Sequence, residues 1–109
     1  MRNETRRGLD EVGGGYAGKP RPAVIVQDDR FDATASITVC AFKTDLTDAP
    51  LIRLPVSPTG RNGLRSASRV MVDKITTVSK SKMGKQVGQL DQKDLARLDR
   101  AIAVFLGLT

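Results

Sequence analysis

Residues 21–26 read Arg-Pro-Ala-Val-Ile-Val, and the polar run Gln-Asp-Asp follows them directly. From Ala23 onward this stretch is apolar on both faces of an extended chain, which is the pattern of a central, doubly covered strand. Pro22 is compatible with the first position of such a strand, where it removes no hydrogen bond from the ladder. The sequence therefore predicts a buried strand here, around which the rest of the fold is expected to assemble.

Two more strands are expected next. In residues 36–42 the apolar side chains Ile37, Val39 and Ala41 share one side, and the alternate residues, Cys40 among them, share the other. Residues 51–56 read as an edge strand because Pro55 closes them.

The rest of the β structure is expected over residues 68–73 and 75–78 and in a short strand around Val87. The basic residues 80–85 are predicted to form a loop before that last strand. At the other end of the chain, residues 1–20 are polar and glycine-rich, which predicts a flap and a poorly formed first strand.

A helix is predicted over residues 91–106. Asp91 is placed to cap its N-terminus, and Gly107 provides a stop. Spacings of three and four residues gather an apolar face for the core, formed by Leu95, Leu98, Ile102 and Phe105. Several short strands followed by one docked helix predict a mainly β domain of the α+β class, a small twisted barrel spanning residues 1–109.

The charge balance favours an anionic partner. Eighteen Lys and Arg residues stand against twelve Asp and Glu residues, giving a formal charge of +6 and a sequence pI near 10.0. The chain has no histidine and one cysteine, Cys40, which excludes an internal disulfide, a Cys/His zinc site and a two-histidine ribonuclease mechanism. The first twenty residues contain no apolar signal region, so a cytoplasmic location is expected.

Several stretches resemble the MazF/PemK toxins. The opening from Gly13 to Val26 is similar to the family's loop and Arg-Pro strand, and residues 39–45 resemble its strand ending in hydroxyl residues. Residues 61–64, 68–75 and 87–90 continue the likeness, which covers roughly residues 13–108.

The resemblance implies an SH3-like barrel of the CcdB/MazF type with a C-terminal helix, acting as a homodimer. It implies the toxin of a type II toxin-antitoxin system, an mRNA interferase that cleaves single-stranded RNA at specific sequences to 2′,3′-cyclic phosphate and 5′-hydroxyl ends. No metal or other cofactor is implied. The implied protein partner is an antitoxin whose acidic disordered tail lies over the RNA groove.

This chain departs from the family pattern at three places. Leu9 to Val12 replace the usual alternating first strand, Lys43 replaces the first of two hydroxyl residues, and Met71 stands where some relatives have an arginine two residues before their aspartate.

Carried over residue by residue, the resemblance gives three catalytic candidates. Arg21 would stabilise the phosphorane through paired hydrogen bonds, Thr44 would position the phosphate, and Asp73 would act as general base. Candidate RNA contacts are flap residues, with Tyr16 as a stacking platform, and cations that bind the RNA backbone. They are Gly14, Gly15, Tyr16, Lys19, Lys43, Arg61, Arg65, Arg69, Lys80 and Lys82, with Lys85 beside them.

Two alternatives belong to other functional classes. A CcdB-like poison of DNA gyrase would share the fold, but such proteins use a tryptophan near the C-terminus and this chain has none. A non-catalytic RNA-binding relative would fit the three departures. Cys40 is interpreted as a small core residue, and Asp28, Asp29 and Asp32 as a solvated loop and not a metal cluster.

Overall fold

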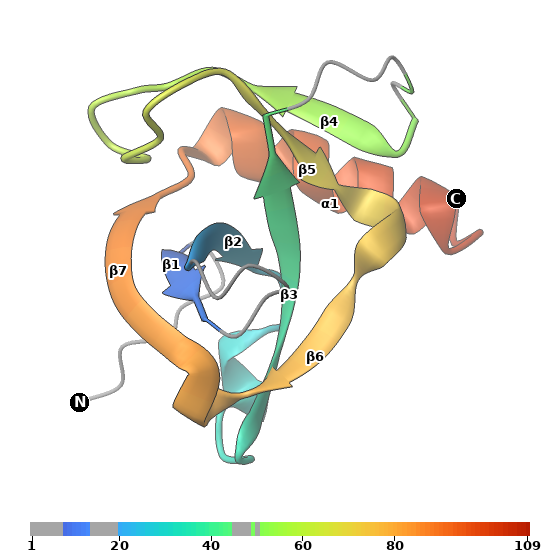
Figure 1. Ribbon diagram of the computed structural model, residues 1–109. Helices are drawn as coiled ribbons and strands as arrows, with labels where there is room; N and C mark the ends of the chain where they lie inside the picture. Colours follow the sequence, from blue (N-terminus) through green and yellow to red (C-terminus); the bar gives the residue numbers. More distant parts are fainter. Residues whose placement is uncertain (1–7, 14–19, 45–48, 50) are drawn as a thin grey trace.

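The computed structural model describes residues 8–13, 20–44, 49 and 51–109. Within them the chain forms seven strands, three 3-10 turns and one α-helix (Figure 1). In chain order they are β1 (Gly8–Val12), β2 (Arg21–Ile25), η1 (Asp29–Phe31), β3 (Ser36–Lys43), β4 (Arg53–Val56), β5 (Ser68–Met71), η2 (Val72–Lys74), β6 (Thr76–Ser79), η3 (Lys80–Lys82), β7 (Met83–Gln89) and α1 (Gln92–Phe105).

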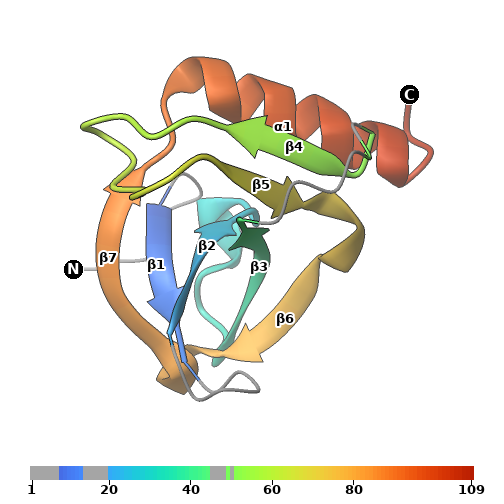
Figure 2. The ribbon, with the colours of Figure 1, turned by 45° about the horizontal axis from the view of Figure 1, so that its top comes forward.

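The strands form one antiparallel sheet in the order β4-β5-β3-β2-β1-β7. The long strand β3 changes partner along one of its edges: residues 36–39 pair with β6, and Phe42 and Lys43 pair with β5. This change of partner lets the sheet curl into the barrel-like shape of Figure 1, while α1 packs across the β4 and β5 end (Figure 2). The predicted mainly β domain with one C-terminal helix is confirmed, as are the central position of β2 and the edge position of β4.

Alternation along β2 and β3 divides the core into two clusters, one on each face of the sheet. The smaller cluster contains Ala23, Ile25, Ile37 and Val39. The larger one lies between the sheet and α1 and consists of Leu9, Val24, Cys40, Phe42, Leu54, Val56, Leu64, Val70, Val72, Leu90 and Leu98. The alternation predicted for residues 36–42 is therefore correct, and it fixes which side chains of β2 and β3 can share a surface.

The predicted helix is confirmed at both ends. The Asp91 carboxylate accepts a hydrogen bond from the Asp94 backbone N–H at 2.9 Å, and Gly107 follows the helix with φ of 74°. Leu95 and Leu98 are buried, but Phe105 is 43% exposed, so its assignment to the core face is wrong. It lies in the last turn, beyond the turns that supply the core. No described helix is long and apolar enough to cross a membrane.

The prediction of a poorly formed first strand is wrong. β1 lies inside the sheet between β2 and β7, and Leu9 and Asp10 are buried. Only its pairing with β7 is irregular, with register shifts on either side of Asp10. Pairing on both edges overrides the weak strand propensity of the segment.

Two boundaries also differ from the predictions. The strand predicted over residues 68–73 ends at Met71, and residues 72–74 form the turn η2. The basic loop predicted at 80–85 is shorter, because β7 already begins at Met83.

Candidate nucleic-acid interface

Three of the predicted basic residues lie on one face of the sheet, on three neighbouring strands. Lys43 of β3 is directly opposite Arg69 of β5. The last paired residues of β2 and β3 at this end are Ala23 and Ala41. Two residues beyond this pair, the same register places Arg21 opposite Lys43. Because alternate residues share a face, Arg21, Lys43 and Arg69 form a basic row at this end of the sheet.

The row brings cationic side chains close together. Like charges directly opposite each other in a sheet destabilise it, and in the described part of the chain neither Arg21 nor Arg69 has an ion-pair partner. A phosphate-bearing chain laid across the row would relieve this repulsion. The arrangement is therefore suited to binding a polyanion.

An ion pair lies beside the basic row. Arg53 of β4 is directly opposite Met71, and its guanidinium pairs with the carboxylate of Asp73. Both side chains are largely buried, at 14% and 22% exposure. Some relatives have an arginine where this chain has Met71. Here Arg53, on the neighbouring strand β4, provides a guanidinium next to Asp73. Arg53 was not among the residues predicted, since its pairing depends on the β4 register.

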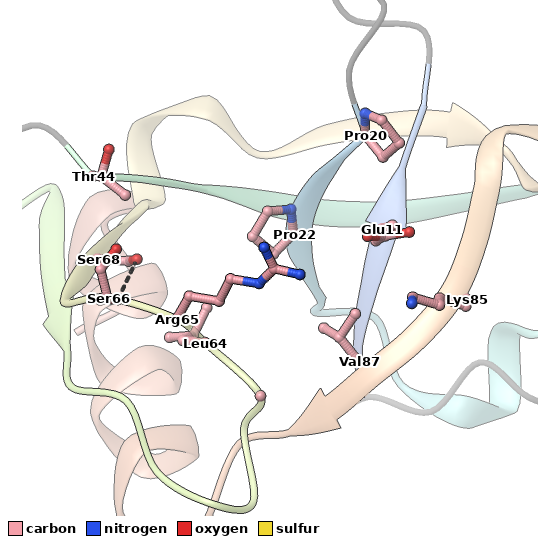
Figure 3. Close-up of a pocket in the computed structure, with 11 residues that line it drawn as sticks. Glu11, Pro20, Pro22, Thr44, Leu64, Arg65, Ser66, Ser68, Lys85 and Val87 are labelled. Carbon is pink, nitrogen blue, oxygen red and sulfur yellow. Dashed lines mark hydrogen bonds between the residues drawn. The ribbon is translucent and has the colours of Figure 1, made fainter.

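The opposite face of the same end of the sheet contains a pocket of about 450 Å³ (Figure 3). Its walls are apolar, from Pro20, Pro22, Leu64 and Val87 with the backbone of Gly63. Its polar lining comes from Glu11, Thr44, Arg65, Ser66, Ser68 and Lys85. Of the predicted residues that the structure describes, Thr44, Arg65 and Lys85 line this pocket.

The two sites separate the catalytic candidates. Thr44 lines the pocket, whereas Arg21 and Lys43 belong to the basic row, and Asp73 is engaged by Arg53 next to that row. Arg21 and Asp73 are not among the residues that line the pocket, so Thr44 is the one catalytic candidate of the described residues that lies there. Arg21 is nevertheless flanked in sequence by Pro20 and Pro22 of the pocket, so the row and the pocket meet at the start of β2.

One wall of the pocket is a turn built around the buried side chain of Asn62. Its Oδ1 accepts hydrogen bonds from the backbone N–H groups of Thr59 and Leu64, at 3.0 and 2.9 Å, and its Nδ2 donates to the Ser57 carbonyl at 2.8 Å. Gly63 has φ of 72°, and a Cβ there would lie 2.1 Å from the Val87 carbonyl oxygen. This close approach holds the turn against β7 and sets the position of Arg65.

The remaining basic candidates are dispersed. Lys80 pairs with Asp32 at 3.2 Å and donates to the Asp32 carbonyl, at the Ser36 end of β3, away from the basic row. Lys82 is exposed, and its carbonyl accepts from the Gly13 N–H. Arg61 is exposed on the Asn62 turn. The candidates Gly14, Gly15, Tyr16 and Lys19 lie outside the described residues.

Cys40 is a core residue, as predicted. It is fully buried, and burial raises the pKa of its thiol to about 11, which disfavours the nucleophilic thiolate. The acidic residues after β2 have loop roles: Asp28 caps η1 and pairs with Arg30, and Asp32 pairs with Lys80.

The comparison with protein families matches residues 8–106 to the model described as "PemK-like, MazF-like toxin of type II toxin-antitoxin system". The chain belongs to this family of toxins. It is 55% identical over 95 residues to the "Probable endoribonuclease MazF" of Mycolicibacterium smegmatis, and the match covers 87% of each chain.

Solved structures show the same fold. Mycobacterium tuberculosis toxin MazF-mt6 superposes with a TM-score of 0.79 and 24% identity, covering 94% of this chain and 99% of that one. An endoribonuclease in complex with its cognate antitoxin from a mycobacterial species gives 0.77 at 24% identity, covering 100% and 98%. The predicted MazF-type fold is thereby confirmed.

Three polar residues that line the pocket were not predicted from the sequence, namely Glu11, Ser66 and Ser68. Glu11 was not predicted because residues 9–12 have poor strand character, Ser66 lies outside the matching stretches, and Ser68 belongs to the stretch 68–75 but has no predicted role. One signal in the sequence could have identified Glu11. It lies two residues after the apolar Leu9, and alternate residues of a strand share a face. Leu9 is buried, and Glu11 lies on the same side of the sheet.

Proposed function

We propose that this MazF-family toxin is a metal-independent endoribonuclease that cuts single-stranded RNA at specific sequences and leaves 2′,3′-cyclic phosphate and 5′-hydroxyl ends. The observation that carries the proposal is the basic row of Arg21, Lys43 and Arg69. Three cations on adjacent strands can contact the phosphates of one nucleic-acid backbone, which supplies most of the non-specific affinity for nucleic acids. Family membership and the relatives named as endoribonucleases support the same activity.

The reaction moves one proton away and brings one in. The 2′-hydroxyl loses its proton and its oxygen bonds to phosphorus; the bond from phosphorus to the 5′-oxygen then breaks, and that oxygen takes up a proton. Negative charge grows on the non-bridging oxygens in between. A cation held in place before the reaction stabilises this charge without reorganising.

Arg21 is the residue proposed for that role. It is exposed at the first position of β2, whose following residues are buried, so its backbone is rigid while its guanidinium reaches the solvent. A guanidinium can donate two parallel hydrogen bonds to phosphate oxygens. Lys43 and Arg69 hold the flanking backbone, and Thr44 positions the nucleotide on the pocket side.

Asp73 is proposed as the general base, acting as a pair with Arg53. The ion pair orients the carboxylate, and it joins β4 to the turn η2 that follows Arg69's strand. In this chain Arg53 takes the place of the arginine that some relatives have two residues before the aspartate.

The proposed setting is that of a toxin-antitoxin pair in the cytoplasm. An antitoxin with an acidic disordered tail would lie across the basic row and compete with RNA for it. The solved antitoxin complexes of mycobacterial and Deinococcus radiodurans relatives support such a partner.

The test is incubation of the purified protein with a long RNA in EDTA, followed by mapping of both ends at each cut. We expect cleavage to persist, because the charges the reaction needs are supplied by arginine and lysine side chains. Cleavage that stops in EDTA and returns with Mg²⁺ would contradict the metal-free mechanism. Binding without any cut would identify a non-catalytic relative. Inhibition of DNA gyrase with intact RNA would favour the CcdB-like alternative, which the endoribonuclease relatives do not support.

A further inference from the structure

The pocket opposite the basic row has the chemistry of a site for a planar heterocycle. Its walls are the apolar surfaces of Pro22, Leu64 and Val87, which can cover the two faces of a flat ring. Its charged groups lie at the edges. A phosphate would meet the Glu11 carboxylate as well as the cations, so the pocket is poorly suited to an anion.

The charged groups of the pocket are available for a ligand. In the part of the chain that the structure describes, no hydrogen bond or ion pair engages the Glu11 carboxylate, the Arg65 guanidinium or the Lys85 ammonium. Figure 3 shows Arg65 reaching from its loop toward Pro22, with Glu11 and Lys85 on the far side, on β1 and β7. A carboxylate and a guanidinium thus approach the same space from different sides.

Both charged residues are held by rigid backbone. Glu11 is paired with Pro22 of β2 and lies at a register shift on the β7 side, where a Cβ at Gly84 would come within 3.3 Å of the Glu11 Cβ. Arg65 follows the Asn62 turn, whose side-chain hydrogen bonds fix it against β7. The direction of approach of each charge is therefore built into the fold.

Among the four RNA bases, guanine matches this arrangement. Its N1–H and N2–H₂ groups are adjacent donors that can meet both oxygens of one carboxylate, and its O6 and N7 are adjacent acceptors for an arginine. Adenine and cytosine place a ring acceptor next to their amino group, and uracil flanks its single N–H with two carbonyl oxygens. A carboxylate would be repelled by each of these neighbouring acceptors.

We propose that this pocket binds a guanine base of the RNA, with Glu11 reading the N1 and N2 donors and Arg65 the O6 and N7 acceptors. The inference rests on the proposed function, since it assumes that RNA is the ligand of the adjacent basic row. Its consequence is that the RNA sequence recognised by the toxin contains a guanine near the cleavage point.

The test measures binding to pentauridylates in which every ribose is 2′-O-methylated, so that no cleavage can occur. The central base is uracil, guanine or hypoxanthine, the last of which is guanine without the N2 amino group. We expect the parent protein to bind the guanine oligomer on the order of tenfold to a hundredfold more tightly than the hypoxanthine oligomer, the range for losing a bidentate base contact. Glu11→Gln keeps one neutral acceptor in place of two carboxylate oxygens, so it should lose most of the preference for guanine and bind the uracil oligomer as well as the parent does.

Asp29→Asn is the matched control, because it removes the same charge from an exposed loop residue and should keep the full preference for guanine. The inference is overturned if the parent protein does not distinguish guanine from hypoxanthine, or if Glu11→Gln keeps the parent's full distinction. The first comparison needs no variant, so the inference remains testable even if Glu11→Gln fails to fold. Failure of the proposed function is a separate result: no cut in long RNA, or no binding of the uracil oligomer.

Discussion

Arg21 combines two properties that a transition-state cation needs. It is exposed and lacks an ion-pair partner among the described residues, and it starts a strand whose next buried residues are Ala23, Val24 and Ile25. The charge of such a side chain is available to a ligand, while the backbone that carries it is already fixed by the strand. Lys43 and Arg69 share the row, so ground-state binding does not depend on Arg21 alone.

We predict that Arg21→Ala removes cleavage and only modestly weakens RNA binding. Losing one donor aimed at developing charge typically lowers the rate about a hundredfold to a thousandfold. Arg21→Lys should recover little, because an ammonium cannot make the two parallel hydrogen bonds. Cleavage assays and binding to a 2′-O-methylated RNA measure the two effects separately. If Arg21→Ala cuts as fast as the parent, the active centre must be sought around Asp73.

At the scale of elements, the turn at residues 57–67 is the part that the site most depends on. The buried amide of Asn62 satisfies two N–H groups and one carbonyl that have no other role in the turn. Gly63 and Gly88 then allow the backbones of the turn and β7 to approach each other directly: a Cβ at Gly88 would lie 2.3 Å from the Asn62 carbonyl carbon. The turn is thus a fixed wall and not a mobile loop.

We predict that Asn62→Ala lowers the free energy of unfolding by about 3 kcal/mol, because it leaves buried backbone groups without partners. Arg61→Ala, a neighbour in the same turn with an exposed side chain, should change it by less than about 0.5 kcal/mol. Urea denaturation at one fixed protein concentration compares the two. Equal stability of both variants would show that the Asn62 side chain does not support the turn.

Element by element, the fold was largely predictable and the site only in part. Strands with dense apolar patterns, such as 21–26 and 36–42, and the capped helix follow from local periodicity. The strand character of β1 was underestimated. Its stability comes from pairing with β2 and with β7, and a local pattern in residues 8–12 does not reveal that pairing. The same limit applies to the site: Lys43 opposite Arg69, Arg53 with Asp73, and Glu11 in the pocket are products of register and pairing.

For the whole molecule, we predict a homodimer. The small barrel leaves large apolar side chains exposed near the end of α1 and before β4, namely Leu51, Val104, Phe105, Leu106 and Leu108. A two-fold partner is the usual way to remove such surface from water. Sedimentation velocity at micromolar concentration should give twice the chain mass of 11.8 kDa. A single species of the chain mass would contradict the prediction.

The pairing of β1 with β7 joins residues from opposite ends of the chain, Gly8 to Gln89. During synthesis on the ribosome, β1 emerges early and waits with one edge open until residues 83–89 follow, and the core stays uncovered until α1 is made. Such long-range closure is slow and comes last. The sheet that carries the basic row and the pocket therefore closes only after residues 83–89 have been made, so both surfaces take their final shape late in folding.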